Sequence, residues 1–202
     1  MMTNDTHNRS TKTFAAPARR SAEPSGVANL MWIVILALTG LGGSLVISCV
    51  TPFVALAVAL AGTVRIGAAL RAMTAIWLTN QFIGFVFFHF PRTANTVLGG
   101  LAIGGAALLS TIVAASTLQR AAARPILARL GLALLLAYAA YEAGLFVAAL
   151  FFGGVEMFSP TIIAQIGFVN LVWLIGIVAL NELVAVLCKT WLGIVPRLAK
   201  AL

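Results

Sequence analysis

Apolar residues in this chain gather in long continuous segments that short polar or basic stretches separate. A strand of a membrane barrel alternates between apolar and polar residues over about ten positions, whereas a helix that crosses a bilayer needs about 20 consecutive apolar residues. The pattern therefore predicts an all-α integral membrane protein. Its expected membrane spans are 30–50, 53–70, 72–90, 96–118, 129–152 and 161–188.

The first apolar run is too long for a single span, because no charged residue interrupts it from Val27 to Val64. Pro52 lies within the run and is the expected break, since proline lacks a backbone donor and clashes with the preceding helical turn. The second span is the weakest of the six, because it is long enough only if Arg65 snorkels and its helix continues to Leu70. The alternative is a re-entrant segment, which would move every later loop to the other side of the membrane.

The distribution of basic residues chooses between these two topologies, because lysine and arginine are enriched in cytoplasmic loops. With six spans, twelve of the thirteen basic residues lie inside and Arg92 alone lies outside. With five spans, five lie inside and eight lie outside. We therefore expect a six-transmembrane-helix bundle with both termini in the cytoplasm, located in the inner (cytoplasmic) membrane of a bacterium.

Composition also indicates a membrane protein, and it excludes a nucleic-acid-binding one. Hydrophobic residues make up 61% of the chain and charged residues 9%, whereas a soluble domain carries about 25% charged residues. The net charge of +8 comes from short loops and tails rather than from a basic surface that would bind nucleic acid. Residues 1–27 are polar and basic, so we expect a disordered cytoplasmic tail ahead of a membrane domain at 28–202.

Polar side chains at membrane depth are costly, and they usually face the protein interior or a cavity. The third span carries Asn80 and Gln81, and the fifth carries Tyr138, Tyr141 and Glu142. Tyr138 and Glu142 are four residues apart and therefore share one helical face. Two interpretations of Glu142 stay open: a structural carboxyl group that is protonated or hydrogen-bonded, and a substrate contact or proton site.

Two residues on the expected outer side have side chains that can ligate a metal. Cys49 lies beside Pro52, where the first span ends, and a thiol there is a soft ligand for a metal or a metal-bearing cofactor. His89 lies at the outer end of the third span. The alternatives are that Cys49 packs as a small hydrophobe and that His89 is a polar cap.

Gly100 and Gly104 give the fourth span a face of small residues, which allows two helices to approach closely in lipid. This face either packs inside the monomer or docks on another membrane protein. The sequence has no phosphate-binding loop, no Cys-x-x-Cys and no pair of histidines at helical spacing. We therefore expect neither an enzyme nor an intrinsic cofactor.

Two segments resemble a known family of transport proteins. CVTPFVALA at 49–57 and WLTNQFIGF at 77–85 look like the six-helix substrate-binding S-components of energy-coupling-factor vitamin importers. The chain is most similar to the solitary proteobacterial members proposed to import cobalamin or its precursors, and the resemblance covers about residues 30–110. It implies a substrate pocket near the outer face, cobalamin or another corrinoid as the transported substrate, and transport with or without a separate energising ATPase and transmembrane module.

In that family a cysteine is understood to coordinate the cobalt of cobalamin, and the resemblance gives this role to Cys49. The expected function is therefore import of a vitamin. The residues expected to bind the substrate are Cys49, Asn80, Gln81, His89, Tyr138, Tyr141 and Glu142.

Two other functions are kept as alternatives. One is a non-transporting membrane scaffold or assembly factor that docks through Gly100 and Gly104. The other is a proton or cation channel centred on Glu142, which would need oligomerisation to form a ring of polar groups.

Overall fold

The computed structural model describes residues 30, 33–38 and 51–192, with the side chains at 157, 185 and 187–192 excepted. Its helices are α2 (Phe53–Thr63), α3 (Ile66–Val86), α4 (Ala94–Arg120), α5 (Ile126–Phe152), the short 3-10 helix η1 (Val155–Met157) and α6 (Pro160–Leu192). The all-helical prediction is confirmed for this part of the chain. The expected tail at 1–27, Cys49 and most of the first expected span, 30–50, lie outside the described residues.

Three helices in the described residues are long and apolar enough to cross a membrane. They are α4 with 27 residues, α5 with 27 residues, and the Pro160–Val184 part of α6 with 25 residues. At a rise of 1.5 Å per residue, each exceeds the hydrocarbon core of a bilayer, which is about 30 Å thick. The all-helical fold of the described residues is thus compatible with a helical membrane protein, with these three helices as candidate spans.

The helix boundaries differ from the expected spans in the region of residues 53–90. The segment 53–70 is divided, because α2 ends at Thr63 and α3 begins at Ile66. Val64 and Arg65 have extended backbone angles, and this link lets the Arg65 side chain reach the surface while the preceding helix stays buried. α2 is consequently an 11-residue helix, about 16 Å long and therefore about half the thickness of the hydrocarbon core. Helix α3 takes over residues 66–71 and ends at Val86, four residues before the expected end at 90.

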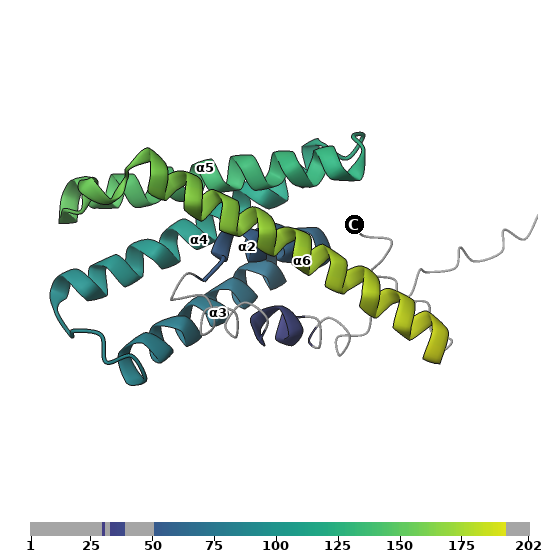
Figure 1. The fold of residues 1–202 in the computed structure, drawn as a ribbon, viewed down its shortest axis with the longest axis horizontal. Coiled ribbons are helices and arrows are strands. Elements are labelled where there is room, and N and C mark those ends of the chain that lie inside the picture. Colours follow the sequence, from purple (N-terminus) through teal and green to yellow (C-terminus); the bar gives the residue numbers. More distant parts are fainter. Residues whose placement is uncertain (1–29, 31–32, 39–50, 193–202) are drawn as a thin grey trace, which may run out of the picture.

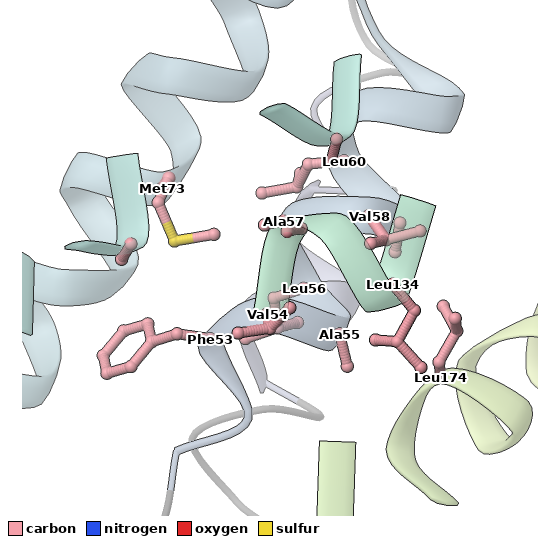
Figure 2. Close-up of a cluster of buried hydrophobic side chains, with 14 of the residues drawn as sticks. Phe53, Val54, Ala55, Leu56, Ala57, Val58, Leu60, Met73, Leu134 and Leu174 are labelled. Atoms are coloured by element: carbon pink, nitrogen blue, oxygen red, sulfur yellow. The ribbon is translucent and has the colours of Figure 1, made fainter. Parts of the chain in front are cut away.

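α2 lies at the centre of the packed core. Its residues Phe53–Leu60 are all buried. It packs against α3, α4, α5 and α6, and Figure 2 shows Met73 of α3, Leu134 of α5 and Leu174 of α6 in the same cluster. Leu36, from the described part of the first expected span, also belongs to this cluster. The most buried helix of the fold is therefore enclosed by other helices rather than by lipid.

α4 lies between α3 and α5 (Figure 1). Its most extensive packing is with α5, and it also packs against α2 and α3. α6 crosses α2 and makes fewer contacts with α5. Because α3 and α5 pack on α2 and α4 rather than extensively on each other, polar residues on α3 and α5 are held in different parts of the fold.

Candidate functional site

The contact between α3 and α4 is built around the two glycines of the small-residue face. Gly100 and Gly104 are buried. A Cβ atom on Gly104 would lie 2.5 Å from Cε2 of Trp77, and one on Gly100 would lie 2.5 Å from Oε1 of Gln81. Trp77 also donates a hydrogen bond from Nε1 to the carbonyl oxygen of Gly100, at 2.8 Å. The glycine face is therefore filled by α3 of the same chain, and a second protein could use it only by displacing that helix.

Two asparagines tie the start of α2 to neighbouring helices. The first turn of a helix has backbone N–H groups without intrahelical partners, and Pro52 before α2 provides no side-chain cap. Asn170 of α6 supplies a partner, because its Oδ1 accepts a hydrogen bond from the Ala55 N–H at 3.1 Å. Asn80 of α3 accepts a hydrogen bond from the Thr51 hydroxyl at 2.7 Å. Asn80, a predicted substrate contact, is thus engaged with the segment that leads into α2.

The sequence did not lead us to predict that Asn170 pairs with the start of α2, although its position on an apolar helix gives a signal for such a contact. It begins a buried stripe on α6 that Leu174 and Ile177 continue and Asn181 ends. The spacing of four, three and four residues keeps these side chains on one helical face. An asparagine on the buried face of an apolar helix needs a hydrogen-bond partner, and a helix that follows a proline offers unpaired N–H groups. At the other end of the stripe, the Nδ2 atom of Asn181 is buried and makes no hydrogen bond.

His89 lies in the turn between α3 and α4 and is exposed. Its Nδ1 atom is 3.0 Å from the carbonyl oxygen of Phe87, and its backbone has a positive φ of 53°. The histidine therefore makes its polar contact within its own turn. In the part of the chain that the structure describes, no three histidine, cysteine, aspartate or glutamate side chains are grouped to hold a metal ion. Cys49, the predicted ligand to cobalt, lies outside that part.

The polar residues of α5 form a separate group. Tyr138 donates a hydrogen bond from its hydroxyl group to the carbonyl oxygen of Ile163 on α6, at 2.5 Å. Its ring lies beside Gly167, where a Cβ atom would be 3.1 Å from Cε1 of the tyrosine. Tyr141 is buried in the core cluster, and Glu142 is partly buried. Three predicted binding residues are thus together on little more than one turn of α5, and Tyr138 joins them to α6.

Glu142 has a carboxyl oxygen, Oε1, that is buried and has no hydrogen-bond partner. The carboxyl group and the Tyr138 hydroxyl form a side-chain hydrogen bond, and the same hydroxyl contacts the carbonyl oxygen of Ile163, but the Oε1 atom itself has no partner. A buried acceptor without a donor costs about 1–3 kcal/mol, and more when it is charged. The arrangement is therefore suited to accept a hydrogen bond from a group that does not belong to these helices.

The predicted binding residues do not form one cluster in the described structure. Those on α3 and the turn after it contact the segment before α2, α4 or their own turn, whereas those on α5 lie together beside α6. Comparison of the chain with models of protein families, with curated proteins and with solved structures finds no match.

Proposed function

We propose that this protein is an integral-membrane importer of the S-component type that carries a small molecule with hydrogen-bond donors, most specifically a corrinoid. The resemblance of residues 49–57 and 77–85 supports the class of protein. The three long apolar helices support its location in a membrane. The observation that carries the proposal is the buried, unpartnered Oε1 atom of Glu142 beside Tyr138 and Tyr141.

The group on α5 suits a substrate with amide side chains, which a corrinoid has around its ring. An amide N–H that reaches Glu142 would give its buried oxygen the donor that it lacks, so the free-energy cost of that oxygen in the empty protein would favour binding. The interaction would also be selective, because a site with a buried polar group rejects a ligand that leaves the group unpaired.

The segment after Cys49 is anchored near the same part of α6. Ile163 accepts the hydrogen bond from Tyr138, and Asn170 accepts the one from Ala55 in the first turn of α2. These two α6 residues are seven positions apart, which is about 10 Å along a helix. The α5 group and the start of α2 thus contact α6 about 10 Å apart, and we propose that a corrinoid meets the α5 group with its amides and takes Cys49 as a cobalt ligand. In this proposal Asn80 and Gln81 support the fold, and they do not contact the substrate.

Spectroscopy of purified protein with added cobalamin tests this assignment. A thiolate that binds cobalt changes the visible absorption of the corrinoid, so we expect a spectral change that Cys49→Ser abolishes. Cys188→Ser is the matched control and should leave the change intact. Cobalamin that binds without any spectral change would contradict thiolate ligation, and the absence of binding would contradict the corrinoid. Mass spectrometry of small molecules that co-purify would then identify the substrate.

We further propose six membrane crossings with both termini in the cytoplasm of a bacterium, because this topology places nearly all basic residues inside. In this topology the second crossing would need residues beyond α2, because α2 alone covers about half of the hydrocarbon core. Single cysteines at the exposed positions Glu156 and Ala123 test the topology in a variant whose native cysteines are serine. A membrane-impermeant maleimide added to intact cells should label position 156 and not position 123. The reverse labelling would contradict six crossings.

Uptake measurements separate import from the scaffold alternative. Deletion should abolish growth on scavenged vitamin if the protein is an importer and should leave growth intact if it is a scaffold. The scaffold alternative rests on the scarcity of ionisable groups and on Gly100 and Gly104, whose face α3 already covers. Repeating the assay in a strain without an energising ATPase module would show whether the protein requires such a partner.

A further inference from the structure

The turn between α3 and α4 exposes a group of aromatic side chains next to a cation. Phe87, Phe88 and Phe90 are 66%, 45% and 42% exposed. Arg92 follows them and is also exposed. Exposed aromatic residues are costly in water, and several of them in one turn mark a surface that has a partner. We name residues 87–92 the aromatic turn.

The aromatic turn has a defined shape. The N–H groups of Phe87 and Phe88 donate to the carbonyl oxygen of Ile83, at 2.9 and 3.2 Å, and the Phe90 N–H donates to that of Gly84 at 3.1 Å. The Phe90 ring packs over Gly84, where a Cβ atom would lie 2.7 Å from its Cε2 atom. The Phe88 and Phe90 rings are stacked, with centroids 6.1 Å apart. The rings are thus presented by a folded turn, in which contact with a partner needs little further ordering.

The position of the aromatic turn along α4 indicates what it contacts. α4 has 27 residues and is therefore about 40 Å long, whereas the hydrocarbon core is about 30 Å thick. If α4 crosses the bilayer, both of its ends lie in the interfacial layers. The aromatic turn precedes the first end, and Arg120 and Arg124, without aromatic neighbours, flank the second. The apolar exposed surface also continues from the turn onto the helices, at Val86 of α3 and Val97 of α4.

We propose that the aromatic turn binds the headgroup layer of the bilayer and sets the depth of α3 and α4 in the membrane. Aromatic rings are enriched at this level because they are apolar and still tolerate the polar boundary. Arg92 complements the negative charge of a lipid phosphate, with which a guanidinium forms paired hydrogen bonds. A lipid surface fits better than a soluble protein, because the rings continue the surface that these helices would present to the lipid chains. The proposal rests on the membrane location and not on the identity of any substrate.

Spin-label accessibility in nanodiscs of phosphatidylcholine and phosphatidylglycerol tests the proposal. A label on Asn95→Cys, in the variant with serine at both native cysteines, leaves all three rings and Arg92 in place. A label on Ala123→Cys reports on the opposite end of α4. We expect the ratio of oxygen to water-soluble nickel-complex accessibility to be several-fold higher at position 95 than at 123.

Further variants test whether the aromatic rings and Arg92 hold the turn at this depth. Adding Phe87→Ser and Phe88→Ser should lower the accessibility ratio at position 95 and leave position 123 unchanged, and Arg92→Gln should do the same to a smaller extent. A label at 95 that the nickel complex reaches freely in the intact protein would overturn the proposal and would show a turn open to a soluble partner. An unchanged ratio after loss of the rings would overturn it as well. The accessibility ratio at position 95 with all three rings in place tests the proposal even if the variants that lack Phe87 and Phe88 do not fold.

Discussion

The α3–α4 contact and the α5–α6 contact both place an aromatic hydrogen-bond donor beside a glycine of the neighbouring helix. Trp77 lies against Gly104 and donates to α4, and Tyr138 lies beside Gly167 and donates to α6. The contacts differ in what remains unpaired. No buried side-chain polar atom on α3 or α4, as described, lacks a hydrogen bond, whereas Glu142, one turn after Tyr138, has a buried oxygen without a donor.

Stability therefore explains the residues of the α3–α4 contact, but it does not explain all of those in the α5–α6 contact. In the α3–α4 contact, close packing and the indole hydrogen bond account for the residues present. In the α5–α6 contact, no hydrogen bond accounts for the buried Oε1 atom of Glu142. Native proteins leave few buried polar groups unpaired, and those that they keep are found preferentially at functional sites.

Gly104→Leu should cause the largest loss of stability. Its Cβ would lie within 2.5 Å of the Trp77 ring, so the indole must move and the close approach of α3 and α4 is lost. We expect the free energy of unfolding to fall by about 3 kcal/mol, as for an overpacked core. Thermal unfolding in detergent, followed by circular dichroism, measures the change. Gly105→Leu is the matched control, because nothing lies within 4 Å of a Cβ there; an equal loss in both variants would contradict specific packing at Gly104.

Asn170→Leu should have the next largest effect. It removes the acceptor for the Ala55 N–H and leaves that donor buried, at an expected cost of about 2 kcal/mol. Asn181→Leu provides the comparison on the same face of α6, because the Nδ2 of Asn181 makes no hydrogen bond. We expect that variant to be as stable as the wild type or more stable. If both substitutions lower the unfolding temperature equally, Asn170 does not act as the cap of α2.

Trp77→Phe and Tyr138→Phe compare the two aromatic contacts directly. Each removes one hydrogen bond to a backbone carbonyl oxygen, at 2.8 and 2.5 Å respectively. Tyr138→Phe keeps the whole ring, so we expect it to lower the free energy of unfolding by about 1 kcal/mol. Trp77→Phe also removes the part of the indole that packs on Gly104, so its loss should be larger. Only Tyr138→Phe should also weaken substrate binding, measured by titration of the purified protein. Weaker binding in Trp77→Phe alone would place the site at α3 and reverse our assignment.

Glu142→Met should have the smallest effect on stability and a large effect on binding. The apolar side chain has a similar shape and removes the unpaired oxygen, so the unfolding temperature should stay constant or rise. Substrate affinity should fall at least tenfold, because the acceptor is gone. Glu142→Gln keeps an acceptor and should retain more affinity than Glu142→Met. A large loss of stability in Glu142→Met would show instead that the carboxyl group is structural.

The positions of α4, α5 and α6 could be predicted from the sequence to within a few residues. Their apolar segments are continuous, and Pro125 and Pro160 stand where α5 and α6 begin. At the start of α4, Thr93 accepts a hydrogen bond from the Thr96 N–H, which is the contact expected of a helix cap. Such signals are local, and a pattern along the chain can reveal them.

The division of 53–70 and the roles of the polar residues could not be predicted in the same way. α2 stops at Thr63 because its surroundings bury it and expose Arg65, and that environment comes from helices later in the chain. The sequence marks Asn80 as a polar residue at membrane depth, but its partner is Thr51, 29 residues earlier. The grouping of Tyr138 with Glu142 was predicted, because a spacing of four residues places both on one face. Which of their atoms stays unpaired depends on Ile163, on another helix.

The enclosure of α2 has a consequence for how the chain is assembled during synthesis. The helix is too short to be stable in lipid by itself, and its capping residue Asn170 lies 115 positions after Ala55. α2 therefore cannot reach its final surroundings until the ribosome has made most of α6. In ribosome-bound chains that end before α6, α2 should not yet have its final packing. Resistance to proteases should therefore appear in a single late step, once α6 has been made.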